Sequence, residues 1–254
     1  MLPVLHLGPL AIQLPGLILL AGIWFALVLA EKQARINRME KPDLLSTLFI
    51  ITILAGIVGA RAGFILRYPA AFADNPLSML SLSFTMLDIP TGLLFGGLAA
   101  LIFQQRKHLK LLELLDILTP GLAILAIAFS LADLSSGQRF GYPADLPWSI
   151  YLWNSWRHPT QLYTLFGSGA LLVAYFPKHT TLAPGMRFFS FTVIYAALEI
   201  LVDAFRADTN LLAFGFHQTQ VIAWIIILAA YLILRKTGNN PSEQEEIHEP
   251  SIKK

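Results

Sequence analysis

Residues 44–66 read LLSTLFIITILAGIVGARAGFIL, and this stretch decides the class of fold. Arg61 is its only charged side chain. Because an α-helix needs about 20 apolar residues to cross the hydrocarbon core of a bilayer, the stretch predicts a transmembrane helix. Other stretches share this character: residues 10–30, 87–105, 111–131, 160–177, 187–205 and 217–235. We therefore expect an all-α fold, a polytopic membrane helix bundle with about seven transmembrane helices.

Two of these stretches, 87–105 and 160–177, are short and interrupted by glycine. A six-span alternative would make one of them re-entrant. The composition supports a membrane protein in either case, because 56% of the 254 residues are hydrophobic and only 13% are charged. Soluble domains carry roughly 25% charged residues. Such a chain must expose most of its surface to lipid.

Several classes of site are excluded or disfavoured by the sequence. There is no cysteine, which excludes disulfides, a cysteine nucleophile and cysteine-ligated metals. No two histidines have the spacing of metal ligands on a helix, and P-loop, GxGxxG and HExxH motifs are absent. We therefore expect no metal, no other cofactor and no nucleic-acid partner.

The basic residues predict the orientation of the helices. Thirteen of the 18 fall on one side of the predicted spans, which the positive-inside rule makes cytoplasmic. The N-terminus is then outside and the C-terminus inside. We expect residues 1–236 to form the bundle, with an outer loop at 132–158, and the polar residues 237–254 to form a disordered cytoplasmic tail. The first eight residues lack a basic region and a cleavage site, so we expect no removable signal peptide.

The remaining basic residues lie at or near the outer side, and none of them is lysine. Arginine binds phosphate oxygens through two parallel hydrogen bonds, whereas lysine offers a point charge. The group therefore favours a shared anionic ligand. Alternatively, each arginine reaches lipid phosphates on its own, or pairs with Asp74, Asp133, Asp145 or Asp208. The five are Arg61, Arg67, Arg139, Arg157 and Arg206.

Polar side chains in apolar stretches give two further candidates. Glu199, Asp203 and Arg206 follow i, i+4, i+7 spacing, which places them on one face of the sixth helix. Ionisable residues inside a span usually face a cavity or the bundle interior, although Asp203 and Arg206 could simply satisfy each other. His158 precedes the fifth span and can take up a proton near neutral pH. More often, such a histidine is only a hydrogen-bonding group.

Five motifs occur in order along most of the chain. The most specific is Arg157-His158-Pro159-Thr160-Gln161-Leu162-Tyr163. The others are Gly8 to Ile12, Val58 to Phe64 around Arg61, Asp133 to Gly141 with its continuation to Trp148, and Val202 to Arg206 followed by Gln220. Together they are similar to the motifs of the bacterial prolipoprotein diacylglyceryl transferase family.

The resemblance implies a function and a site. Members of this family transfer a diacylglyceryl group from phosphatidylglycerol to the lipobox cysteine of a lipoprotein precursor, at the bacterial cytoplasmic (inner) membrane. By this resemblance, the catalytic candidates are His158, Asp203 and Arg206. The substrate-binding candidates are Arg61, Asp133, Arg139, Gly141, Arg157, Gln161, Tyr163 and Gln220. The expected partners are phosphatidylglycerol, the precursor peptide and membrane lipid.

The chain departs from the family pattern at several positions. A first-span tyrosine is replaced by Pro15, and a His-Gly-Gly sequence by Pro90-Thr91-Gly92. An expected loop arginine is Ser130, for which Arg139 is a candidate replacement. Further departures are Ala132 for glycine, Gln138 for an acidic residue and Thr164 for glutamate.

These departures leave an alternative open, namely an inactive or retasked member that binds phospholipid headgroups or modifies another acceptor. A transporter or channel is disfavoured, because the charges gather near one leaflet and do not form a path across.

Overall fold

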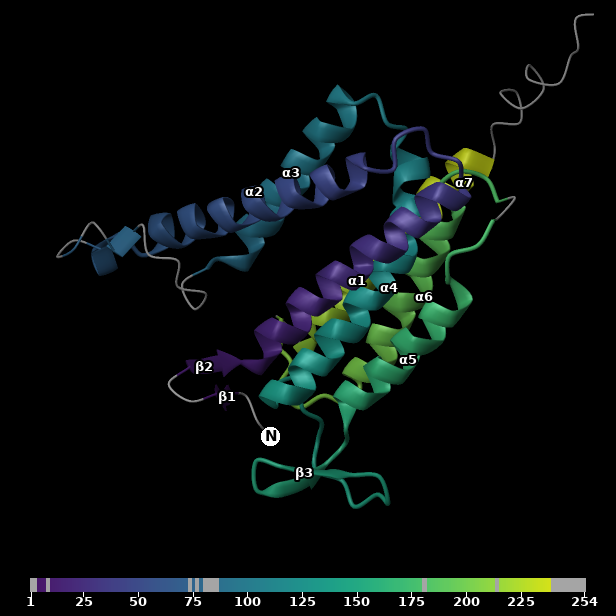
Figure 1. The fold of residues 1–254 in the computed structure, drawn as a ribbon. Helices are drawn as coiled ribbons and strands as arrows, with labels where there is room; N and C mark the ends of the chain where they lie inside the picture. The colour runs from purple at the N-terminus through teal and green to yellow at the C-terminus, as the bar shows by residue number, and fades with distance from the viewer. Residues whose placement is uncertain are drawn as a thin grey trace, which may run out of the picture. The chain divides into compact units, whose positions relative to one another are not determined.

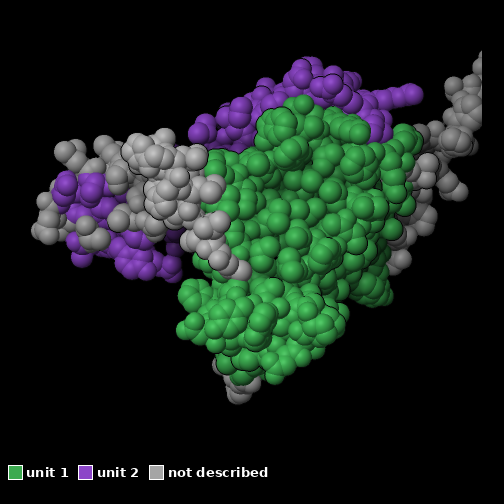
Figure 2. Space-filling view, turned by 60° about the horizontal axis from the view of Figure 1, so that its bottom comes forward, with its two compact units in different colours: residues 1–33, 115–254 green, residues 34–114 purple. Residues whose placement is uncertain are grey.

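A computed structural model describes residues 4–7, 10–72, 75, 78–79, 87–179, 182–212 and 215–238. Asp74, Gly8, Pro9 and residues 239–254 of the predicted tail lie outside these ranges. The described residues form seven α-helices and two small β-hairpins (Figure 1). The chain divides into two compact units, residues 1–33 with 115–254 (unit 1) and residues 34–114 (unit 2), which are coloured separately in Figure 2.

Unit 2 is a helical hairpin of α2 (Leu44–Arg67) and α3 (Ile89–Arg106), with the short helix η1 (Pro69–Phe72) after α2. Small residues let the two helices approach closely. A Cβ atom on Gly92 would lie 3.0 Å from the carbonyl oxygen of Gly56, whereas one on Gly97 would have no neighbour within 4 Å. The glycines of 87–105 therefore serve helix packing, with Gly97 as an exception.

Asp88 begins α3. Its carboxylate accepts hydrogen bonds from the backbone N–H and the hydroxyl of Thr91, and it forms a 2.7 Å ion pair with Arg67. A side chain of this kind at a helix N-terminus satisfies an N–H group that has no partner within the helix. The hydrogen bonds from Thr91, ahead of the charge of Arg67, lower the pKa of Asp88 despite some desolvation.

Unit 1 contains most of α1 (Leu14–Ile36) and α4 (Leu111–Ser136), together with α5 (Thr160–Ala174), α6 (Met186–Asp203) and α7 (Gln218–Gly238). In Figure 1 α4, α5 and α6 run side by side. Their shared core contains Ala123, Leu171 and Phe191, one from each helix. Gly22 and Gly121 bring α1 and α4 together, because a Cβ on either residue would meet Ala128 or Ala26.

The predicted helices are confirmed, and the chain is a multi-pass membrane protein. By length and composition, α1, α2, α4 and α7 can cross a membrane. The α5 helix has 15 residues and is therefore only about 22 Å long, while α6 contains the charged residues Arg187, Glu199 and Asp203. The number of spans and the side of each terminus remain predictions.

Some boundaries differ from the predicted ones. The first span was expected to begin at residue 10, but Leu10–Gln13 form strand β2, which pairs with β1 (Val4–Leu7). The α4 helix continues to Ser136, so the first residues of the predicted outer loop are helical. Within that loop, β3 (Ile150–Leu152) and β4 (Ser155–Arg157) form a hairpin that the all-α prediction did not include. Residues 237–238 of the predicted tail belong to α7.

A polar cluster around two buried side chains, Gln33 and Arg187, lies at the beginning of α6. We call these two residues, with Asp116 and the backbone of Lys178, the Arg187 cluster. Arg187 is 3% exposed and donates hydrogen bonds to the backbone carbonyls of Tyr175, Phe176 and Lys178. The carboxylate of Asp116 accepts from the N–H groups of Gly185 and Phe188, at 2.7 and 2.8 Å. The amide of Gln33 pairs with the backbone of Lys178 through both its nitrogen and its oxygen. These bonds fasten the α5–α6 connection to α1 and α4.

Candidate functional site

The other end of α6 lies beside a small backbone platform built from residues 140–144. The N–H of Tyr142 donates to the carbonyl of Phe205 at 2.9 Å, and that of Ala207 to the carbonyl of Phe140 at 3.0 Å. On the opposite edge, the N–H of His158 donates to the carbonyl of Tyr142 at 3.0 Å. The platform therefore ties the segment after α6 to the segment that enters α5.

Gly141 is the point of closest approach in this platform. A Cβ atom there would lie 2.5 Å from both the Cβ and the carbonyl oxygen of His158, and 3.0 Å from the carbonyl of Phe205. No side chain fits unless the backbone segments separate. Gly141, which was predicted to bind substrate, therefore has a packing role that explains why glycine occurs there.

The β3–β4 hairpin extends beyond the helix ends (Figure 1). Its two-residue turn, Trp153-Asn154, has positive φ at both positions, 52° and 59°, which is an uncommon backbone conformation for a bulky residue. Trp153 is held there by a hydrogen bond from its Nε1 to the carbonyl of Gly137, at 3.1 Å. The guanidinium of Arg157 donates to the carbonyls of Leu152 and Gly141 and lies over the ring of Phe140. Arg157 was predicted to bind phosphate, and here it fastens the hairpin to the platform.

Ionisable side chains gather next to the platform. We call Asp133, Arg139, Glu199, Asp203, Arg206, Asp208 and His217 the Arg206 cluster. Arg206 is 9% exposed. Its Nη1 lies 3.5 Å from Oδ1 of Asp203, and its Nε and Nη2 lie 3.1 and 2.9 Å from Oδ1 of Asp208. Arg206 lies beyond the end of α6, so helical spacing alone does not place it; the predicted grouping with Asp203 is nevertheless present.

Arg139 joins the same cluster from the loop after α4. Its guanidinium is paired with Glu199 and lies 3.7 Å from Asp133. Burial would lower the pKa of Arg139, but the charges of Glu199 and Asp133 outweigh it and raise that pKa, so the group stays charged. Ser130, at the position where an arginine was expected, donates to the carbonyl of Ala126 in its own helix.

His217 belongs to this cluster but was not among the predicted site residues. Its Nδ1 lies 2.7 Å from Oδ2 of Asp203, a side chain with no exposed surface. It precedes α7 and is brought to Asp203 by the return of the chain after α6, where the N–H of Gln218 donates to the carbonyl of Asn210. No sequence pattern signalled this pairing. Gln220, another predicted residue, lies in the first turn of α7.

The start of α5 presents a second polar group. Gln161 is 2% exposed and donates from Nε2 to the carbonyl of Gln138, at 2.6 Å. Among the described residues, its Oε1 is one of few buried side-chain acceptors with no hydrogen-bond partner. Such a buried acceptor is costly unless a ligand or water satisfies it.

Aromatic side chains surround His158. Its Nδ1 lies 3.1 Å from the hydroxyl of Tyr163, and this hydroxyl also accepts a hydrogen bond from Nε1 of Trp148 at 3.0 Å. The imidazole ring lies 5.1 Å from the ring of Phe205. His158 and Tyr163 are therefore held together, as their places in one motif predicted.

Arg61 lies in unit 2, on α2. It donates to the backbone carbonyls of Ser78 and Met79, at 2.6 and 2.9 Å, and lies over the ring of Phe72. These contacts fasten the segment after α2, and a role toward phosphate remains a prediction for this residue. No group of three His, Asp or Glu residues suited to a metal ion is found in the described ranges.

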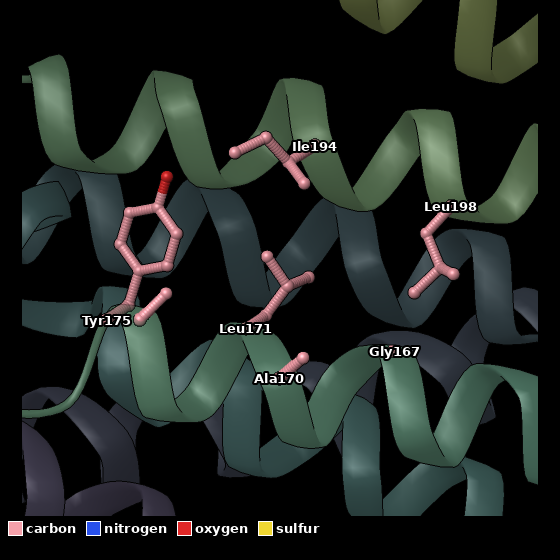
Figure 3. A pocket seen from close by; sticks show the side chains of 7 residues that line it. Gly167, Ala170, Leu171, Tyr175, Ile194 and Leu198 are labelled. Carbon is pink, nitrogen blue, oxygen red and sulfur yellow. The ribbon is translucent and has the colours of Figure 1, made fainter.

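An apolar groove runs between α5 and α6 (Figure 3). Its volume is about 540 Å³, and Gly167, Ala170, Leu171, Ala174, Tyr175, Ile194 and Leu198 line it. Small residues on α5 form its floor, and Ile194 and Leu198 reach toward them from α6. Gln161 and Asp203 lie on the same two helices, in the direction of the Leu198 end.

Comparison with known proteins gives the family. The family model described as prolipoprotein diacylglyceryl transferase matches residues 3–235. The phosphatidylglycerol–prolipoprotein diacylglyceryl transferase of Bordetella parapertussis is 31% identical over 252 residues, covering 94% of this chain and 95% of that protein. The protein of the same name from Thermoanaerobacter pseudethanolicus is 27% identical over 253 residues, with 94% of each chain covered. The resemblance of the motifs is thereby confirmed, and the chain belongs to the prolipoprotein diacylglyceryl transferase family.

Proposed function

We propose that this protein transfers a diacylglyceryl group from phosphatidylglycerol to the cysteine thiol of a lipoprotein precursor. The reaction takes place at the outer side of the bacterial cytoplasmic membrane, with the N-terminus outside and the C-terminus in the cytoplasm. Arg206 carries this proposal, because it is a buried arginine whose partners include a carboxylate that a phosphate can replace. Family membership does not favour the alternative of a member that only binds headgroups.

The phosphate of the donor lipid lies against Arg206. Asp203 is fully buried and orients this guanidinium from inside the protein, whereas Asp208 is partly exposed and only two residues along the chain. A phosphate can therefore displace Asp208 and, with two oxygens in place of the single Oδ1, form the bidentate pair that arginine favours. As the lipid's carbon–oxygen bond breaks, charge builds up on the leaving glycerol phosphate and the guanidinium stabilises it.

Arg139 supplies the second positive charge, in place of the arginine expected at Ser130. It reaches the cluster from the loop and is paired with Glu199 of α6. The two guanidiniums thus approach the site from different segments. Asp133, which also contacts Arg139, positions this side chain.

Near the Arg206 cluster, a polar side chain can bind the lipid headgroup and an apolar groove can bind one acyl chain. The unpartnered Oε1 of Gln161 can accept a hydrogen bond from a glycerol hydroxyl, and Tyr163 lies two residues further along α5. The apolar groove between α5 and α6 has space for a hydrocarbon chain, because its lining is almost entirely aliphatic. A lipid headgroup at the Arg206 cluster would direct its chains along these helices.

The test uses purified protein, phosphatidylglycerol and a synthetic lipobox peptide, with mass spectrometry of the diacylglyceryl thioether. Wild type should form product, and Arg206→Ala should lose at least about 100-fold in rate, the usual effect of removing a donor that stabilises developing negative charge. Arg106→Ala is the matched control, because Arg106 is exposed, lies in the last turn of α3 and is not one of the five arginines predicted at the outer side. Absence of product from wild type, with a family member active in parallel, would overturn the proposal.

A further inference from the structure

The transfer needs a base, and His217 has the surroundings of one. A free thiol has a pKa of about 8.5, so roughly 3% of it is thiolate at pH 7. The chain has no cysteine, and the nucleophile must therefore be the thiol of the peptide substrate. A group in the site that accepts the thiol proton would raise the thiolate fraction.

One histidine, His217, belongs to the Arg206 cluster, and a second, His158, packs against the ring of Phe205. Their hydrogen bonds differ. His158 faces the hydroxyl of Tyr163 through Nδ1, and a hydroxyl can either donate or accept. His217 faces a carboxylate of Asp203, which can only accept when ionised. Nδ1 of His217 must therefore carry the hydrogen, and in the neutral ring Nε2 is left as the acceptor.

The setting of His217 fits this role in two further ways. Its side chain is 19% exposed while that of Asp203 is 0% exposed, so the carboxylate lies behind the imidazole and not in front of it. Among the described residues, both side-chain hydrogen-bond contacts of His217, to Asp203 and at 3.4 Å to Thr209, are made at Nδ1. Nε2 is thus not engaged by these partners.

The other members of the Arg206 cluster are charged side chains from several elements. They are Glu199 and Asp203 on α6, Arg206 and Asp208 in the segment that follows, Asp133 at the end of α4 and Arg139 after it. Four carboxylates face two guanidiniums. Of these, Asp203 contacts His217 directly, at 2.7 Å, and is the counter-ion for an imidazolium formed during the reaction.

We propose that His217, oriented by Asp203, accepts the proton of the substrate thiol; this inference rests on the proposed transferase function. The thiol proton moves to Nε2, and the sulfur electron pair forms the S–C bond to the glyceryl carbon. The C–O bond to the phosphate breaks, and its electron pair leaves with glycerol phosphate. The imidazolium then releases its proton to glycerol phosphate or to water.

The carboxyl group of Asp203 contacts both the proposed base, His217, and the proposed phosphate-binding residue, Arg206. Oδ2 of Asp203 contacts His217, while its Oδ1 is the atom nearest Arg206. A thiol at His217 and a phosphate at Arg206 would therefore approach from neighbouring positions. Asp203 acts through both partners and is a positioning residue for each.

The test is the pH dependence of thioether formation by His217→Asn. The asparagine amide can still donate to Asp203 from a position close to that of Nδ1, but it has no basic nitrogen. At pH 7 the variant should be roughly 30-fold slower than wild type, and the difference should shrink to about twofold at pH 8.5, where half of the thiol ionises unaided. A merely structural loss would not depend on pH in this way.

Controls separate this inference from the proposed function. His179→Asn alters an exposed histidine in the connection between α5 and α6 and should behave as wild type. His217→Gln is the second variant, used if His217→Asn gives no folded protein. An active wild type with a pH-independent loss in His217→Asn, or with the pH-dependent loss in His158→Asn instead, would overturn only the role of His217. A wild type that forms no product would overturn both.

Discussion

The two ends of α6 both bury an arginine, but with different kinds of partner. Arg187, at the beginning, donates to three backbone carbonyls, and its neighbour Asp116 accepts from two backbone N–H groups. Arg206, just after the end, is paired with side-chain carboxylates. Backbone partners cannot leave unless the fold opens, whereas a side chain such as Asp208 can be exchanged for a ligand. The kind of partner, and not burial itself, distinguishes a structural charge from a functional one.

Replacing each arginine by alanine should separate these roles most clearly. Arg187→Ala leaves carbonyls at the α5–α6 connection without donors, which should lower the stability of unit 1 by about 3 kcal/mol, because each unsatisfied buried group costs about 1–3 kcal/mol. Thermal unfolding in detergent would measure this. Arg206→Ala should lower the midpoint of thermal unfolding less than Arg187→Ala does, but it should abolish transfer. An Arg187→Ala protein as stable as wild type would contradict the structural role of Arg187.

The platform beside Arg206 should be sensitive to a single methyl group. Gly141→Ala forces its Cβ against His158 and Phe205, and overpacking of this kind costs about 1–3 kcal/mol. The thioether assay should show at least about a tenfold loss. Gly97→Ala is the matched control, because nothing lies within 4 Å of a Cβ at Gly97. Equal activity of the two variants would show that the backbone segments around Gly141 can move apart without loss of function.

The groove between α5 and α6 should affect lipid selection more than the chemical step. Ala170→Trp fills part of the groove and should raise the KM for long-chain phosphatidylglycerol by roughly tenfold, since about two buried methylene groups would lose contact, at about 0.8 kcal/mol each. Short-chain phosphatidylglycerol should be affected less. Kinetics with both lipids would test this, and an equal effect on the two would place the acyl chain elsewhere.

The smallest effect on stability is expected at Asp88. Its ion pair with the exposed Arg67 differs from both the backbone partners of Arg187 and the buried carboxylate partner of Arg206. Its lowered pKa means that the carboxylate stabilises the folded state at pH values above the ordinary 3.8, and that this contribution is lost as pH falls through the lowered value. Asp88→Asn should therefore be slightly less stable than wild type at pH 5, and the difference should be smaller near pH 3. Unfolding midpoints at both pH values provide the measurement.

The helices could be predicted from sequence because lipid imposes one requirement on every span, namely about 20 apolar residues with internally paired backbone. The β1–β2 hairpin was missed because Leu10–Gln13 are as apolar as the helix that follows. The β3–β4 hairpin depends on Trp153 and Asn154 adopting positive φ, which their residue types do not predict reliably.

The site was predictable where its residues are close in sequence and not where the chain returns to it. Asp203 and Arg206 are three residues apart, and His158, Gln161 and Tyr163 share one motif. His217 contacts Asp203 only because the chain turns back between α6 and α7. The spacing of the two residues in the sequence does not predict this contact. Arg139 was a candidate because of its position in the loop, but its pairing with Glu199 depends on the packing of α4 against α6.

The loop between α4 and α5, which contains the β3–β4 hairpin, has a practical consequence. Three of the five tryptophans of the chain are Trp148, Trp153 and Trp156. The indole of Trp148 is bonded to Tyr163 and that of Trp153 to Gly137, which places two fluorophores directly on the segments that carry the site. The protein thus contains its own optical reporter, and its intrinsic emission can follow the arrival of lipid or peptide without any added label.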